Sequence, residues 1–288
     1  MTFLTIISIF ELMSKEFILT TKRNDLLRIT AYGIENSEKP CLIFVHGFKG
    51  FKDWGFGPYA GKYFGDRGYF ILMFNFSHNG VGESLTVFNE LDKFADNTFS
   101  LEVNELSELI SAYLDNYFCR TNNKAIGLIG HSRGGAIALL TAKFRTEVNA
   151  VAVWSSVAKL DRYSERQKEK WRRTGVFEVL NKRTNQVMKL NVSLLEDIEK
   201  NKDNSLNLEK AVKELNRPLM IAHGDQDLAV PVDEAEMLFN WADKGKTIFH
   251  KIPSAGHTFG VSHPFEGSNK NFDDLLIKTE NFFNINLS

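Results

Sequence analysis

The feature that most constrains the fold is a repeated alternation of short, β-rich apolar segments with longer segments of helical periodicity. Such alternation is typical of a mostly parallel sheet with helices on both faces, an α/β fold. Residues Phe99–Tyr117 place apolar side chains at three- and four-residue spacings opposite acidic ones, which predicts an amphipathic helix on the sheet. The expected strands are Leu26–Ile34, Cys41–Val45, Phe70–Phe76, Lys124–Ile129, Val148–Trp154, Pro218–Ala222 and Thr247–Ile252.

One domain over residues 1–288 is the simplest organisation, because glycine and proline are scattered rather than gathered in a linker, and no repeat is visible. The alternation breaks once, at residues 157–215, where we expect helices but no strand. This excursion follows Val148–Trp154, the sixth strand if one more forms near the N-terminus. Long excursions at one end of a sheet usually cover a site. We therefore predict a helical cap, or lid, over residues 157–215.

Charge and cysteine content exclude several classes of protein. Thirty-five basic and 36 acidic residues give a net charge of −1, so no global field favours nucleic acid or an anionic membrane. Cys41 and Cys119 form neither a disulfide framework nor a metal-ligand spacing, which favours a cytoplasmic location. Residues 2–10 are uncharged but too short for a membrane span. They could be a first strand, an atypical export signal, or a stretch preceding a true start at Met13.

A serine flanked by glycines carries the main chemical signal. The segment "AIGLIGHSRGGAIALL", residues 125–140, fits G-x-S-x-G at Ser132, with a strand pattern before it and a helix pattern after it. In that setting the serine hydroxyl is exposed on a tight turn and can act as a nucleophile. The alternative is a glycine-rich turn with a capping serine, which the strand and helix context disfavours. Ser132 is therefore the predicted nucleophile.

A serine nucleophile needs a base and an orienting carboxylate. "HGDQDLAVP" offers Asp225 and Asp227 after one strand, and "AGHTFG" offers His257 after the next. We prefer Asp227, which lies further into its loop, and assign Asp225 to the turn itself. His263 competes with His257, but His257 directly follows a strand and an Ala-Gly pair, which suits an exposed imidazole.

Acyl transfer also requires N–H donors for the developing oxyanion. The predicted donors are the main-chain N–H groups of Arg133, directly after the nucleophile, and Phe48, in the loop "VHGFKG". We expect four side chains to contact substrate, and these are His131, Trp154, Trp171 and Phe177.

The predicted cap is rich in cations. Residues 155–190 contain ten lysines and arginines and four acidic residues. Such faces are usually solvated, and we expect that here. The alternative is that Arg172 and Arg173 contact a carboxylate on the substrate.

Metal and cofactor motifs are missing from the sequence. Seven histidines include no His-x-x-x-His pair, and the glycine-rich segments match neither a dinucleotide fingerprint nor a phosphate-binding loop. We expect neither a metal nor a cofactor.

Four segments, "VHGF", "GHSRGG", "HGDQDLAVP" and "AGHTFG", occur in an order that resembles the α/β-hydrolase superfamily, from about Leu26 to the C-terminus. Residues 74–84 depart from the family pattern, with Asn75 in place of an acid and His78 in place of a glycine. Among members, the chain looks most like dienelactone hydrolases and bacterial acyl esterases, although dienelactone hydrolases use cysteine where this chain has Ser132.

The resemblance implies a serine hydrolase acting on a small-molecule carboxylic ester. Thioester or amide and peptide cleavage, and acyl transfer, remain alternatives because the same residues would serve them. A binding protein on a hydrolase scaffold is a further alternative. It is disfavoured because such proteins usually lose the nucleophile, the acid or the base, and all three candidates are present here. Neither nucleic acid nor a stable membrane span is expected.

Overall fold

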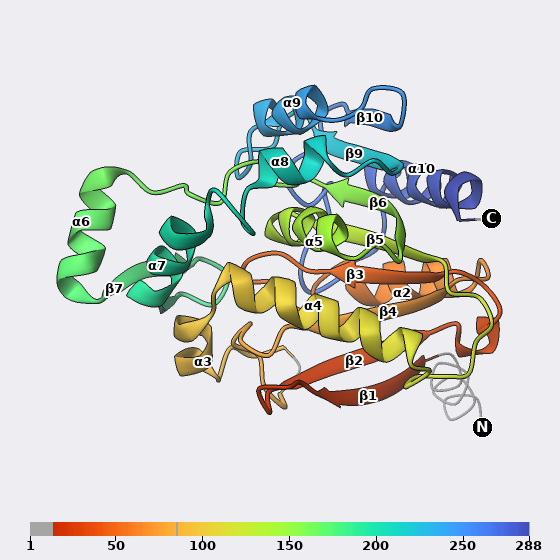
Figure 1. The fold of residues 1–288 in the computed structure, drawn as a ribbon, viewed down its shortest axis with the longest axis horizontal. Coiled ribbons are helices and arrows are strands. Elements are labelled where there is room, and N and C mark those ends of the chain that lie inside the picture. Colours follow the sequence, from red (N-terminus) through yellow and green to blue (C-terminus); the bar gives the residue numbers. More distant parts are fainter. Residues whose placement is uncertain (1–13, 85, 288) are drawn as a thin grey trace.

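The computed structural model describes residues 14–84 and 86–287, so the alternatives for residues 2–10 lie outside the described residues. Figure 1 shows a central sheet with helices on both faces and a lobe that extends from one end of the sheet. In the described residues, no helix is long and apolar enough to cross a membrane.

The central sheet has eight strands in the order β1-β2-β4-β3-β5-β6-β9-β10. The pairs β1–β2 and β2–β4 are antiparallel, and all other neighbours are parallel. The mostly parallel sheet is therefore confirmed, and the predicted strands match to within a few residues. The strand at residues 14–20 was not predicted. The strands are β1 (Ser14–Thr20), β2 (Leu26–Tyr32), β3 (Cys41–Val45), β4 (Phe70–Asn75), β5 (Ile126–His131), β6 (Val148–Trp154), β9 (Leu219–Gly224) and β10 (Thr247–Ile252).

Helices cover the two faces of the sheet and build a separate apolar core on each. Helices α2 (Gly57–Gly65) and α10 (Lys270–Asn286) pack on one face. On the other face lie α4 (Phe99–Leu114), α5 (Arg133–Phe144), α8 (Leu208–Lys213) and α9 (Val232–Trp241). The remaining helical segments are η1 (Ile34–Asn36), α3 (Leu91–Asp96), α6 (Glu165–Thr174) and α7 (Val192–Asn201).

Helix α4 illustrates how the sequence sets the element bounds. The side chain of Thr98 accepts a hydrogen bond from the Leu101 N–H (3.2 Å) and caps the first turn. Leu106 and Leu109 are buried against the core, as the apolar periodicity predicts. The helix ends at Leu114, three residues before the predicted end at Tyr117, because Asn116 adopts a left-handed conformation with φ 61°.

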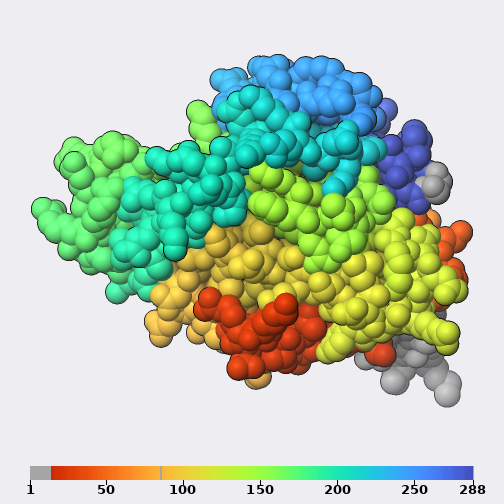
Figure 2. Space-filling view, viewed as in Figure 1, coloured from red at the N-terminus to blue at the C-terminus, as the bar shows by residue number. Residues whose placement is uncertain are grey.

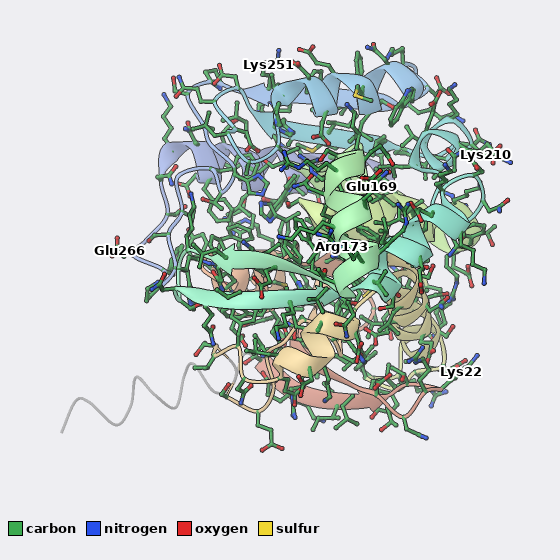
Figure 3. All side chains as sticks on the ribbon, turned by 90° about the vertical axis from the view of Figure 1, so that its left-hand side faces the viewer. Lys22, Glu169, Arg173, Lys210, Lys251 and Glu266 are labelled. Carbon is green, nitrogen blue, oxygen red and sulfur yellow. The ribbon has the colours of Figure 1, made fainter. Side chains whose placement is uncertain are left out.

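Residues 157–215 form a mixed lobe rather than a purely helical one, which corrects the expectation of no strand. Helix α6 is followed by an antiparallel hairpin of β7 (Val176–Asn181) and β8 (Gln186–Asn191), and then by α7 and α8. In β8, Met188 and Leu190 are buried while their neighbours Val187 and Lys189 are exposed. This period of two was the strand signal, but the charged residues between the two strands obscured it. The part of the lobe from α6 to α7 protrudes on the left of Figures 1 and 2, whereas α8 packs against α5, and Figure 3 looks directly onto α6.

The buried apolar side chains of the lobe continue the core on the α4 and α5 face of the sheet. Trp171 is fully buried there, and its indole N–H donates to the Leu190 carbonyl (2.9 Å). Its ring packs against Tyr163 and Phe177, with ring centroids 4.9 Å and 5.2 Å away. Helix α6 begins with a capping box between Ser164 and Gln167.

Candidate active site

Ser132 lies on the tight turn between β5 and α5, in a backbone conformation that ordinary residues rarely adopt. Its φ is 57° and ψ is −123°. Glycines make the turn possible. A Cβ at Gly134 would lie 2.2 Å from the Val45 carbonyl oxygen, and one at Gly130 would lie 2.5 Å from the Gly134 carbonyl oxygen. The strained turn is thus held by close backbone packing, and it presents the serine at the carboxyl end of the sheet.

A chain of hydrogen bonds links Ser132 to a buried carboxylate. Ser132 Oγ lies 3.0 Å from His257 Nε2, and His257 Nδ1 lies 2.7 Å from Asp227 Oδ2. An ionised carboxylate can only accept, so the ring proton belongs on Nδ1. Nε2 is then free to accept the hydroxyl proton of Ser132. The predicted nucleophile, base and acid are therefore brought into sequential contact.

Two adjacent loops position the base and the acid. Asp227 follows β9 and His257 follows β10, and the loops touch where the Gln226 N–H donates to the Ala255 carbonyl (3.0 Å). A Cβ at Gly224 would lie 2.2 Å from that same carbonyl oxygen. The loops can approach this closely only because residue 224 has no side chain.

The environment of Asp227 keeps its carboxylate ionised. Its side chain is 0% exposed, and burial alone would raise its pKa. Hydrogen bonds from His223 and His257, the charge of His257 and the Val230 N–H outweigh burial and hold the pKa of Asp227 well below its usual range. Oδ1 also accepts from the N–H groups of Ala229 (2.8 Å) and Val230 (2.9 Å). These contacts fix the carboxylate facing His257.

The two competing residues serve other roles. Asp225 Oδ1 accepts from the Ser254 N–H (2.7 Å), so it ties the turn, as expected. His263 Nδ1 accepts from the Gly55 N–H (3.0 Å), and its ring stacks on Trp54 at 6.0 Å. Neither side chain is part of the hydrogen-bonded chain that reaches Ser132.

The loop after β3 passes directly beside the nucleophile. A Cβ at Gly47 would lie 2.9 Å from Ser132 Cβ. The Gly47 carbonyl accepts from the Gly50 N–H (2.9 Å) and lies 3.0 Å from His46 Nδ1. The C=O and N–H groups of a trans peptide point in opposite directions. The Phe48 N–H, which shares a peptide group with the Gly47 carbonyl, therefore points away from the side on which that carbonyl is bound. His46 also accepts from the Phe76 N–H through Nε2 (3.3 Å), and burial lowers its pKa to about 4, so it stays neutral.

Arg133 contributes both a main-chain donor and a buried ion pair. As the first residue of α5, its N–H has no acceptor within the helix. Its guanidinium Nε donates to Glu102 Oε2 at 2.8 Å, with side chains 8% and 6% exposed. Burial raises the pKa of Glu102, and the Arg133 charge opposes that rise. The pair joins α4 to the first turn of α5.

A cavity of about 480 Å³ opens beside Ser132, a volume typical of small-molecule sites. His131, one of the four residues expected to contact substrate, lines it, and its Nε2–H donates to the His257 carbonyl (3.0 Å). Burial, with the charge of His257, lowers the pKa of His131 to about 3, so its ring stays neutral. Apolar side chains from the core and the lobe form most of the wall, and these include Phe48, Phe51, Phe56, Phe99, Val157, Leu160, Tyr163 and Leu180.

Three predicted substrate contacts are corrected, because none of these residues is among those that line the cavity. Trp154 is fully buried, and its indole N–H donates to Thr279 Oγ1 (3.1 Å) beneath the sheet. Trp171 and Phe177 pack against each other within the lobe. Aromatic residues near the site were predicted to line the pocket. These three instead pack within the cores of the protein.

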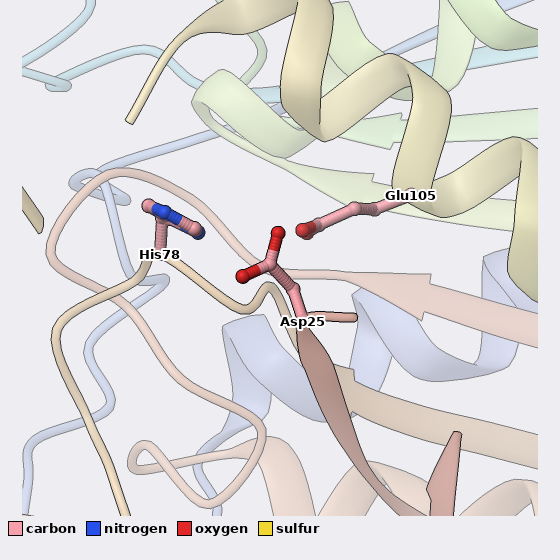
Figure 4. A group of neighbouring side chains, drawn as sticks. All are labelled: Asp25, His78 and Glu105. Atoms are coloured by element: carbon pink, nitrogen blue, oxygen red, sulfur yellow. The ribbon is translucent and has the colours of Figure 1, made fainter. Parts of the chain in front are cut away.

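One cluster away from the cavity has side chains that could hold a cation. Ligand atoms of Asp25, His78 and Glu105 lie within 4.8 Å of one another, and Figure 4 shows the three side chains turned together. Protein groups already bind two of them. Glu105 accepts from the Ser77 N–H (3.0 Å) and hydroxyl, and that hydroxyl oxygen lies 2.6 Å from His78 Nδ1. Burial raises the pKa of Glu105 to about 7. The cluster therefore ties the loop after β4 to α4.

Several residues of the site were not predicted from the sequence. His223 Nε2 lies 2.8 Å from the Val230 carbonyl and 3.4 Å from Asp227 Oδ2, so it braces the acid loop. His46 precedes the glycine of the predicted oxyanion loop, and that position was the available signal. Glu102 offered none, because it is one of several acids on a helix expected to face solvent.

The strand order, the serine turn and the histidine and aspartate loops at one sheet edge define an α/β-hydrolase, which confirms the resemblance read from the sequence. A model of the prolyl oligopeptidase family matches residues 61–276. The chain belongs to the prolyl oligopeptidase family and is a hydrolase.

Three solved structures have a similar fold at low sequence identity. Est1E from Butyrivibrio proteoclasticus with bound ferulic acid has a TM-score of 0.70 at 18% identity, covering 94% of this chain and 98% of that one. The α/β hydrolase GrgF from Penicillium sp. sh18 scores 0.70 at 17%, covering 95% and 99%. The Pyrococcus furiosus esterase Pf2001 scores 0.65 at 17%, covering 98% and 93%. Among proteins with curated descriptions, none matches this sequence.

Proposed function

We propose that the protein is a serine hydrolase that cleaves a small carboxylic ester through an acyl-enzyme intermediate. The observation that carries the proposal is the continuous contact from Ser132 through His257 to the buried Asp227, at the edge of a largely apolar cavity. This arrangement activates a hydroxyl that is otherwise a weak nucleophile.

In the first half-reaction, Ser132 Oγ attacks the carbonyl carbon while its proton moves to His257 Nε2. Asp227 stabilises the resulting imidazolium, because its ionised carboxylate accepts the Nδ1–H. The carbonyl oxygen becomes an oxyanion, and the N–H groups of Phe48 and Arg133 are the proposed donors to it. His257 then protonates the leaving alcohol, and the bond between the carbonyl carbon and that oxygen breaks.

In the second half-reaction, water takes the place of Ser132. His257 accepts a proton from the water as its oxygen attacks the acyl carbon, and returns that proton to Ser132 Oγ as the acid leaves. Every proton therefore passes through one nitrogen of one imidazole. No metal or cofactor takes part in this sequence.

Ester cleavage is preferred to peptide cleavage because of what the structurally similar proteins are named for and bind. The Pyrococcus furiosus protein is named as an esterase, and Est1E holds ferulic acid. The prolyl oligopeptidase family supports peptide cleavage as the second candidate. The cavity walls formed by residues 157–183 of the lobe favour a small substrate over a long polypeptide.

A matched panel tests the proposal. Purified protein is given p-nitrophenyl esters of graded acyl length and p-nitroanilides of short peptides, and both are read by release of the chromophore. We expect ester turnover that falls by about 10⁴-fold or more in Ser132→Ala and in His257→Ala. His263→Ala is the matched control, because His263 lies outside the hydrogen-bonded chain of Ser132, His257 and Asp227, and this variant should lose far less activity. Turnover of the anilides alone would favour the peptidase, and unchanged ester turnover in Ser132→Ala would overturn the mechanism.

A further inference from the structure

The cavity beside Ser132 is lined by cations without matching anions. Six lysines and arginines line it, and among the described residues no aspartate or glutamate does. Two of the six are neutralised nearby, Arg133 by Glu102 (2.8 Å) and Arg162 by Glu234 (2.6 Å). The other four have no carboxylate within ion-pair distance in the described part of the chain, and they are Lys49, Lys159, Lys182 and Arg183.

Three of these four gather where the hairpin of the lobe meets the loop after β3. Lys49 Nζ donates to the Leu180 carbonyl (3.2 Å), and the Arg183 guanidinium donates to the Lys49 carbonyl. Arg183 also lies over the ring of Trp54, 5.3 Å from its centroid. Lys182 is adjacent in the hairpin turn. We call Lys49, Lys182 and Arg183 the cationic rim.

The rim holds like charges together at an energetic cost. Burial together with the charges of Arg183 and Lys182 lowers the pKa of Lys49. Opposite charges would relieve this repulsion, but no carboxylate among the described residues forms an ion pair with Lys49, Lys182 or Arg183. Lys49, Lys182 and Arg183 all line the cavity, and their side chains carry hydrogen-bond donors and no acceptors. Such a wall is complementary to a ligand with negatively charged oxygen acceptors.

We propose that the cationic rim is a binding subsite for an anionic group, a carboxylate or phosphate, on the substrate hydrolysed at Ser132. This inference rests on the proposed function and adds to it the class of substrate. The apolar wall accommodates the body of the substrate, and the rim binds its charged end. The cations that do this come from the hairpin turn and the loop after β3.

This assignment replaces the sequence-based alternative that used Arg172 and Arg173. Arg172 is paired with Glu199 of α7, and neither arginine lines the cavity. Both are exposed on α6, where Figure 3 labels Arg173 at the outside of the lobe. Arg173 therefore provides a matched control, being a cation of the same lobe outside the cavity.

The test compares substrates that differ only in charge. One pair consists of p-nitrophenyl esters of suberic acid whose far end is a carboxylate or a primary amide. A second pair places the charge on the leaving group, as 4-acyloxybenzoate against 4-acyloxybenzamide, and a third replaces the far carboxylate of the first by a phosphate monoester. The quantity measured is the ratio of kcat/KM for the charged ester to that for the neutral one.

We expect a wild-type ratio of about ten in at least one pair, and we expect that ratio to fall as the salt concentration is raised. Lys182→Gln, which breaks no hydrogen bond described above, should lower the ratio several-fold, and Lys182→Gln with Arg183→Gln should bring it close to one. Arg173→Gln should leave the ratio as in wild type. The pair that responds identifies which side of the scissile bond, and which anion, the rim binds.

A ratio near one in all three pairs, or a ratio that falls as much in Arg173→Gln as in the double variant, would overturn the subsite. Neither result would touch the proposed function as long as the neutral esters are hydrolysed and Ser132→Ala abolishes that activity. Conversely, absence of all ester turnover would count against the function and remove the basis of the subsite.

Discussion

The buried ion pair between Arg133 and Glu102 provides a quantitative test of how the nucleophile turn is held. Glu102 Oε2 accepts from Arg133 Nε at 2.8 Å, and its other oxygen accepts from Asn97 Nδ2 at 2.7 Å. Glu102→Ala leaves a guanidinium buried without its counter-charge and an amide without its acceptor. Breaking a buried pair in this way costs about 3–5 kcal/mol. For a chain of this size that corresponds to a decrease in Tm on the order of 10 °C.

The double variant Glu102→Leu with Arg133→Met separates the charge effect from simple loss of packing. Replacing both partners by apolar residues of similar volume is often close to neutral, so most of the stability should return. Phe99, whose ring centroid lies 4.0 Å from the Arg133 guanidinium carbon, gives the methionine an apolar neighbour. Urea unfolding of wild type, Glu102→Leu, Arg133→Met and the double variant gives the coupling energy. A cost below about 1 kcal/mol for Glu102→Ala, or a double variant as unstable as the single one, would refute this reasoning.

Three further predictions follow from the site. Asp227→Asn should lower kcat by about 10⁴-fold, while Asp225→Asn, which loosens only a turn, should stay within tenfold; equal losses would contradict the assignment. Gly47→Ala puts a methyl group 2.9 Å from Ser132 Cβ and should lower kcat by about 10²-fold, whereas wild-type kinetics would show that the loop is not held there. The pKa of Glu105 is raised to about 7, so its protonation favours the fold; that contribution is complete below about pH 4.5 and is lost as pH rises through about 7. Glu105→Gln should therefore gain stability relative to wild type, by at most about 3 kcal/mol between pH 4.5 and pH 8 in urea unfolding, and a constant difference would contradict this.

Local patterns in the sequence were sufficient to predict the sheet and the order of the candidate site residues. The turn at Ser132 was readable because glycines, a strand and a helix are contiguous in the chain. The loop of Asp227 follows the fully buried strand β9, and the loop of His257 follows β10, which is buried only at Ile252. Both strands were predicted, so the place of the two loops at one sheet edge could be inferred. What brings them together is the parallel order β5-β6-β9-β10, which places the ends of those strands side by side.

Features that depend on contacts between distant segments were not predictable. The hairpin at β7 and β8 has a weak alternation, and its turn is dominated by charged and polar residues, so the lobe was expected to be helical. The cationic rim joins Lys49 to Arg183, which are 134 residues apart. Trp154 and Trp171 were assigned to substrate because sequence cannot tell an aromatic residue that lines a cavity from one that fills a core.

The central claim is that Ser132 is the activated nucleophile, and covalent labelling tests it most directly. The protein is incubated with a fluorophosphonate, which reacts with serines activated in this way, and is analysed by intact mass and peptide mapping. We predict one adduct, on Ser132, with labelling lost in Ser132→Ala and strongly slowed in His257→Ala. An adduct on another residue, or undiminished labelling of the Ser132→Ala protein, would contradict the account.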